Sequence, residues 1–150
     1  GRENMVIWDG ACHVHEEFDL EKILELKKEN PKAKIIAHPE CKKHILLISD
    51  YIGSTSELLN FTIKDNCNEF IVATESGIIH QMKKANPQKT FLSPPPKATN
   101  CGCSECNFMK LITLKKIYLT LKYELPEVVL DKKLMNLARL PIKRMLEISK

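Results

Sequence analysis

The sequence has no apolar run that approaches the roughly 18 residues of a membrane-spanning helix, and no charged segment followed by an apolar one opens the chain. It therefore lacks the patterns of a membrane protein and of a secretory leader. It also has no initiator methionine, because it begins Gly1-Arg2-Glu3. We expect a cytoplasmic protein without a membrane partner, and a chain that is a piece of a longer one.

Positive charge is not concentrated in any one stretch. The net charge of +4 comes from lysines spread along the expected helices rather than from one basic stripe, so nucleic acid is a poor candidate for a partner. Internal repeats and low-complexity tracts are absent as well. A length of 150 residues suits about one domain, which can bury a core without disulfide bonds.

Cysteine, by contrast, is plentiful, with six residues in the chain. Thiols in a cytoplasmic protein stay reduced, which favours free thiols or metal ligands over disulfides. Half of the cysteines stand in one stretch, CGCSEC, as Cys101, Cys103 and Cys106. Thiolates favour zinc or iron–sulfur centres, but this spacing matches neither a zinc ribbon nor the common ferredoxin runs. The spacing therefore leaves both kinds of centre open.

Short apolar runs alternate with amphipathic segments along the first part of the chain. Such runs predict buried strands, and apolar residues at helical spacing predict helices. The alternation predicts parallel β-α-β units, hence a Rossmann-like α/β/α fold with helices on both faces of a parallel sheet. The expected strands are 5–8, 34–37, 51–53, 70–74 and 90–92, and the expected helices are 19–30, a short one within 41–47, one that a capping box opens at Ser54, and 77–86.

Consecutive prolines in the stretch SPPPKATN (93–100) end this pattern, because proline disrupts helices and resists pairing in sheets. We expect a linker there. Beyond it, ITLKKIYLTLKYEL and DKKLMNLARLPIKRMLEIS predict two or three helices. Pro141 either kinks the last of them or begins a new one.

Reactive side chains follow four of the expected strands. Ligands of open parallel sheets bind beyond the carboxyl ends of the strands, so this coincidence predicts a site. The groups are Cys12 to His15, His38 to Cys41, Ser54-Thr55 and Thr74-Glu75.

Each of these residues also has an ordinary structural interpretation. His15 and His38, taken singly, suit a core histidine as well as a functional one, and Ser54 suits a helix cap. The remaining histidines and cysteines are interpreted as structural: His44 and His80 as helix-surface residues, and Cys41 and Cys67 as small buried apolar ones.

Two kinds of chemistry suit the strand-end residues. A helix that begins at Ser54 and Thr55 offers hydroxyls, free backbone N–H groups and a positive dipole end, which favour a carboxylate or phosphate. An anionic substrate is therefore expected. His38 and Glu40, on either side of Pro39, can serve as hydrogen-bond donor and general acid or base if both face the pocket.

Five stretches of the sequence stand in a characteristic order and spacing: GACHVHEEF, IAHPEC, DYIGSTSELL, VATESGIIHQM and CNFMKLITLKKIYLTL. In these the chain resembles the quinolinate synthases, the NadA family of NAD biosynthesis, over essentially its whole length. Members of that family are longer and have three similar α/β domains around a central cavity. The resemblance implies a C-terminal portion, with the N-terminal domains of the same enzyme as its partner.

The resemblance implies an enzyme that condenses iminoaspartate with dihydroxyacetone phosphate to quinolinate, phosphate and water. The family carries a [4Fe-4S] cluster on three cysteines, and the matching positions here are Cys12 and Cys106. The third ligand would come from the N-terminal part, so we expect the 150-residue chain alone to be inactive. An iron with an open position acts as a Lewis acid.

The family's substrate-binding positions fall on His38, Pro39, Glu40 and Thr55, with Ser54 and His15 beside them; Glu40 is the expected proton-transfer residue and His38 the second catalytic residue.

The resemblance leaves Cys101 and Cys103 open. They are either dispensable loop thiols or, in the case of Cys103, the partner of a reversible disulfide with Cys106. A competing interpretation is a non-enzymatic zinc-stabilised module, in which these three cysteines and a histidine or Cys12 bind the metal.

The expected organisation follows from the resemblance. Residues 1–18 end a preceding α/β domain with one cluster-ligand loop, and residues 19–97 form the α/β/α domain. Residues 98–150 supply the second cluster-ligand loop and the C-terminal helices.

Overall fold

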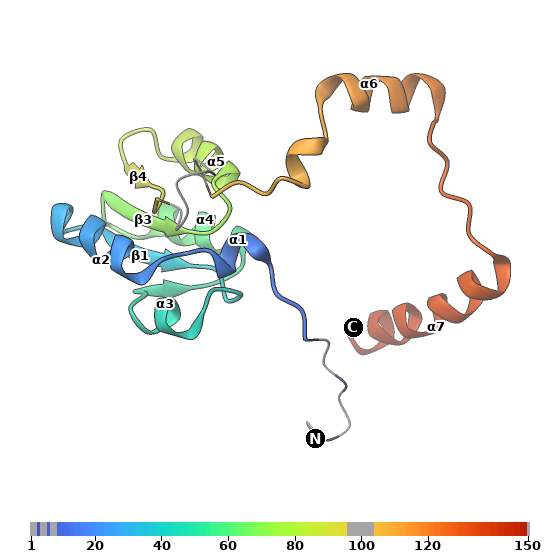
Figure 1. The fold of residues 1–150 in the computed structure, drawn as a ribbon, viewed down its shortest axis with the longest axis horizontal. Coiled ribbons are helices and arrows are strands. Elements are labelled where there is room, and N and C mark those ends of the chain that lie inside the picture. Colours follow the sequence, from blue (N-terminus) through green and yellow to red (C-terminus); the bar gives the residue numbers. More distant parts are fainter. Residues whose placement is uncertain (1–2, 4–5, 7–8, 96–103, 150) are drawn as a thin grey trace. The chain divides into compact units, whose positions relative to one another are not determined.

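The computed structural model describes residues 3, 6, 9–95 and 104–149. The chain divides into two compact units, Gly1–Leu111 and Ile112–Lys150 (Figure 1). The expected strand at 5–8 lies outside the described residues, apart from Val6, which is fully exposed.

The first unit is built on a sheet of four parallel strands in the order β2-β1-β3-β4. The predicted α/β fold with a parallel sheet is confirmed. The strands are β1 (Lys34–Ala37), β2 (Tyr51–Ile52), β3 (Glu69–Ala73) and β4 (Thr90–Leu92), and the helices are α1 (His13–Glu16), α2 (Leu20–Glu29), α3 (Lys43–Leu47), α4 (Thr55–Lys64) and α5 (Gly77–Ala85).

Helices cover both faces of this sheet, because successive strand residues point to opposite sides. On one face Ile35 and Ala37 of β1 pack with Ile23 of α2 and Ile45 of α3. On the other face Ile36 packs with residues of α4 and α5, namely Leu58 and Met82. The result is a three-layer α/β/α arrangement, with α3 and α5 on opposite sides of the sheet (Figure 1).

The ends of the helices follow from their sequences. Asp19 caps α2 by accepting from the backbone N–H of Glu21 at 2.9 Å. The predicted capping box at α4 is confirmed, since Ser54 and Glu57 bond to each other's backbone N–H groups. These caps satisfy donors that the first turn of a helix leaves free.

The second unit contains α6 (Leu114–Tyr123) and α7 (Lys132–Ile148). Pro141 lies inside α7 and begins no separate helix. The apolar side chains of both helices are exposed, from 38% for Leu119 to 86% for Leu114. No described helix is long and apolar enough to cross a membrane.

Candidate active site

Three strands of the sheet end at one edge. Ala37 of β1 stands in register with Ile52 of β2 and with Ala73 of β3. His38 and Thr74 therefore follow adjacent strand ends, as expected for a ligand site in a parallel sheet.

The short helix α1 places His15 over this edge. The side chain is buried, with its Nδ1 atom 3.0 Å from Oε2 of Glu40 and its Nε2 atom 3.1 Å from Oγ1 of Thr74. An ionised carboxylate only accepts hydrogen bonds, so the ring proton lies on Nδ1 and the Thr74 hydroxyl donates to Nε2. The three side chains form one chain of hydrogen bonds.

Burial lowers the pKa of His15, and the electrostatic effect of the neighbouring His38 lowers it further. The Glu40 carboxylate opposes both effects without reversing them. The rings of the two histidines are stacked, with centroids 4.4 Å apart. His15 is therefore neutral near pH 7, where it can pass a proton along the hydrogen-bonded chain.

Glu40 faces both histidines and also solvent. Its Oε2 atom lies 3.7 Å from Nδ1 of His38, and its side chain is 57% exposed. Its backbone N–H donates to Nδ1 of His38 at 3.3 Å, which places the ring proton of His38 on Nε2. A carboxylate held this way can exchange protons with a ligand in the pocket. Pro39, between these two residues, is exposed.

Most of the side chains described so far line one cavity of about 570 Å³. It is lined from the strand ends, the first turns of α4 and α5, and the segment around Cys106. Of the expected site residues, Pro39 and Ser54 are not among those that line it. The lining residues are Cys12, Val14, His15, His38, Glu40, Thr55, Thr74, Glu75, Gly77, Ile78, Gln81, Cys106, Met109 and Lys110.

The N-terminus of α4 presents Thr55 to this cavity. Ser54 has a different place, because its hydroxyl accepts the N–H of Glu57 and its own N–H donates to the Glu57 carboxylate at 2.7 Å. These bonds lower the pKa of Glu57, the side-chain bond being the larger cause. Ser54 therefore serves as the helix cap.

Two thiols, those of Cys12 and Cys106, reach the same cavity. Both are partly exposed and reduced. The two cysteines are far apart in the sequence of the first unit. Cys12 precedes α1, and Cys106 precedes the 3-10 helix η2 (Met109–Leu111). The rings of His13 and Phe108, which lie close to these cysteines in the sequence, meet edge-on with centroids 5.7 Å apart.

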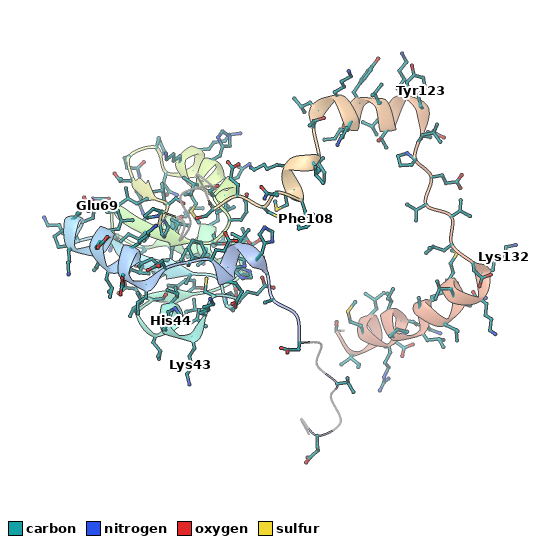
Figure 2. The ribbon with its side chains drawn as sticks, viewed as in Figure 1. Lys43, His44, Glu69, Phe108, Tyr123 and Lys132 are labelled. Atoms are coloured by element: carbon teal, nitrogen blue, oxygen red, sulfur yellow. The ribbon has the colours of Figure 1, made fainter. Side chains whose placement is uncertain are left out.

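The remaining cysteines have other surroundings. Cys41 is buried against the sheet, with its Sγ atom 3.3 Å from the carbonyl of Ala73, and burial raises its pKa to about 12. Cys67 is partly buried and contacts backbone carbonyls. Cys101 and Cys103 lie outside the described residues. His44 stands on the solvent side of α3 (Figure 2), and His80 is likewise exposed.

One group of side chains in the described part of the chain has the donor set of a metal site. The ligand atoms of Cys12, His15 and Glu40 lie within 4.8 Å of one another. A thiolate, an imidazole and a carboxylate together suit zinc.

Three contributors to this site had no specific role assigned from the sequence. Thr74 and Glu75 were noted only because they follow a strand, and their partners His15 and Cys106 are far away in the chain. Lys110 was assigned no role, although it lines the cavity. The one available signal was the polar stretch Thr74-Glu75-Ser76 directly after a buried strand.

The fold and the site define an α/β protein with thiols, imidazoles and a carboxylate at the carboxyl edge of a parallel sheet. The family model described as "Quinolinate synthetase A protein" (NadA) matches residues 1–147. The chain belongs to this family.

Curated relatives agree with that assignment. The chain is 52% identical over 149 residues to a quinolinate synthase of Microcystis aeruginosa, and 52% identical over 149 residues to one of Synechocystis. It is 46% identical over 150 residues to a quinolinate synthase of Chloroherpeton thalassium. These matches cover 99–100% of the chain but 46% of each relative, so the chain spans less than half the length of these relatives.

Proposed function

We propose that this chain is the C-terminal portion of a quinolinate synthase. The complete enzyme would condense iminoaspartate with dihydroxyacetone phosphate to quinolinate, phosphate and water. The observation that carries this proposal is the cavity at the sheet edge, which gathers the motif residues His15, His38, Glu40 and Thr55 with two thiols. The family membership supports it.

The donor set fits an iron–sulfur cluster. Cys12 and Cys106 are partly exposed thiols on one cavity, and thiolates are the usual protein ligands of such clusters. They would come from the segments 1–18 and 98–150, which flank the central α/β/α domain 19–97, and a third thiolate would come from the N-terminal domains. The bound [4Fe-4S] cluster would supply an iron with an open position that polarises a substrate oxygen.

Glu40 would carry the proton transfers of the condensation. Its carboxylate accepts the Nδ1–H of His15 while it remains half exposed toward the cavity. The backbone N–H of Glu40 occupies Nδ1 of His38, not Nε2. We therefore propose that the Nε2–H of His38 donates a hydrogen bond to the substrate. Both residues act at fixed positions because Pro39 stiffens the link between them.

The anionic groups of the substrates would lie at the N-terminus of α4. Thr55 offers a hydroxyl there, and the first-turn N–H groups and the helix dipole favour negative charge. Lys110 lines the same cavity, and its positive charge lies beside the Glu75 carboxylate.

The N-terminal domains of the same enzyme would complete the site. Both α6 and α7 carry lysines together with leucines and isoleucines, and the apolar residues are exposed in the described unit. The relatives are more than twice as long as the matched part, and we propose that their additional length would provide a partner for these faces. The 150-residue chain alone would then lack a cluster ligand and most of the cavity wall, and we expect it to make no quinolinate.

A zinc site is the second candidate, and the grouping of Cys12, His15 and Glu40 favours it. This set differs from the cysteine-rich one expected from the sequence, which included Cys101 and Cys103. In this alternative the chain would bind one zinc ion and need no iron.

One experiment separates the two candidates. The full-length protein is reconstituted anaerobically with iron and sulfide, and iron, sulfide, zinc, colour and quinolinate are measured beside the 150-residue chain. We expect a brown full-length protein with about four irons that forms quinolinate, and a chain that does not. A colourless protein with bound zinc and no product would contradict the proposal, as would turnover by the chain alone.

A further inference from the structure

The segment that carries Cys106 is fastened to the loop between β3 and α5. The backbone N–H of Ser76 donates to the carbonyl of Ser104 at 2.9 Å. The buried Ser104 hydroxyl donates to the carbonyl of Pro94 at 3.3 Å. The backbone N–H of Cys106 donates to Oε1 of Glu75 at 3.4 Å. The position of the segment is therefore set by contacts outside it.

The carboxylate of Glu75 joins three parts of this region. Oε1 accepts from Cys106 and lies 3.7 Å from Nζ of Lys110. Oε2 accepts the backbone N–H of Gly77 at 2.7 Å. The Glu75 side chain is only 16% exposed, and its bond with Cys106 is partly buried, so water competes less for that bond than at an open surface. One side chain thus ties the start of α5 to both ends of the stretch from 106 to 110.

The Glu75 carboxylate occupies space that a side chain at position 77 would fill. A Cβ atom at position 77 would lie 2.6 Å from Oε2 of Glu75, which is closer than such atoms come in proteins. Any side chain at 77 would push the carboxylate out of its place. Gly77→Ala is therefore a way to displace Glu75 while its charge is kept.

We propose that Glu75 is a positioning residue that holds Cys106 at the cavity before any metal binds. The backbone N–H of Cys106 is close to its Cβ, so an acceptor for that N–H restricts where the thiol can point. Groups that orient a ligand in advance improve metal binding. The contacts of Glu75 with Cys106 and Lys110 support the placement of Cys106. The consequence for metal loading rests on the proposed function.

Thr74, the residue before Glu75, orients His15 in a similar way, because its Oγ1 atom lies 3.1 Å from Nε2 of His15. Two neighbouring residues at the end of β3 thus orient two different side chains of the cavity.

Alkylation of Cys106 tests the placement directly. The full-length protein is prepared without metal, with Cys101→Ser and Cys103→Ser so that Cys106 is the one cysteine in its tryptic peptide, 98–110. Reaction with limiting iodoacetamide is followed by mass spectrometry.

Three variants are compared with the parent. Glu75→Gln removes the charge, and Gly77→Ala displaces the carboxylate without removing charge. Glu105→Gln is the matched control, because Glu105 also faces Lys110, at 3.8 Å, but does not accept from Cys106. Buried Cys41 reports on unfolding in every sample.

We expect Cys106 to react about threefold to tenfold faster in Glu75→Gln and Gly77→Ala, the effect of losing one hydrogen bond, and at the parent rate in Glu105→Gln. Unchanged rates in both of the first two variants, with Cys41 unreactive, would overturn the proposal. If Glu75→Gln exposes Cys41, that variant has unfolded and Gly77→Ala alone decides.

Metal retention tests the consequence. After anaerobic reconstitution, we expect Glu75→Gln to lose iron to a chelator faster than the parent and Glu105→Gln do. Equal rates of loss would overturn the link to metal loading. If the parent itself binds no iron while the alkylation result holds, the proposed function fails and the positioning role of Glu75 stands.

Discussion

The imidazole of His15 lies flat against that of His38, with ring planes inclined by 10° and centroids 4.4 Å apart. This stacking places both rings beside the Glu40 carboxylate, at 3.0 Å and 3.7 Å. The pKa of His15 is lowered, first by burial and then by His38, so a neutral imidazole supplies the hydrogen bond to Glu40. The carboxylate is thereby oriented without being tied into a buried ion pair.

Glu40→Gln in the full-length protein tests the proposed proton transfer. The amide keeps the shape of the side chain and removes a group that takes up protons but is not assigned as a cluster ligand. We expect iron content and fold to be retained while kcat falls about 10²–10⁴-fold, the usual worth of general acid–base catalysis. Near-normal kcat with substrate bound would show that another residue transfers the proton.

Thr55→Ala tests the anion site at the start of α4. We expect weaker substrate binding, by about 0.5–1.5 kcal/mol for a neutral hydrogen bond and about 1.5–3 kcal/mol for one to a charged group. KM should rise more than kcat falls. Ser56→Ala is the matched control, since Ser56 is exposed on the same turn and does not line the cavity. Equal effects of the two substitutions would argue against a contact through Thr55.

Asp65→Asn tests the ion pair that joins β1 to the end of α4. Nζ of Lys34 lies 2.6 Å from Oδ2 of Asp65, and this bond is the largest cause that lowers the Asp65 pKa below its usual 3.8. A depressed pKa stabilises the fold above the unfolded value, and this contribution is lost as pH falls through the folded value.

We therefore expect Asp65→Asn to lower the urea midpoint at pH 7 and at pH 5 equally, and the difference from the parent to shrink below pH 3.8. Asp50 provides a comparison, because its carboxylate accepts the backbone N–H of Ile35 at 2.7 Å, whereas the Lys34 ammonium bonds to Asp65. A difference that grows toward acid pH would contradict the assigned sign.

The strands were the easiest part to predict. KIIA at 34–37 and TFL at 90–92 coincide with β1 and β4, since each is a short apolar run that follows a Pro-containing turn. The capping box at Ser54 was equally local, because both partners lie within one turn of α4. Patterns that repeat over a few residues are readable without the fold.

Other features could not be predicted from local patterns. The four residues of α1 are too few to show a helical period. The contacts of His15 with Glu40 and Thr74 span 25 and 59 positions of the chain, and they depend on side-chain rotamers. Pro141 suits either a kink or a first turn in sequence terms, and only the structure places it inside α7.

Serine substitutions at the cysteines, made one at a time in the full-length protein, test the central claim most directly. Iron, sulfide and quinolinate formation are measured after anaerobic reconstitution. We expect Cys12→Ser and Cys106→Ser to lose cluster and activity, and Cys101→Ser and Cys103→Ser to keep both. Retention of the cluster by Cys106→Ser together with its loss in Cys103→Ser would contradict the account.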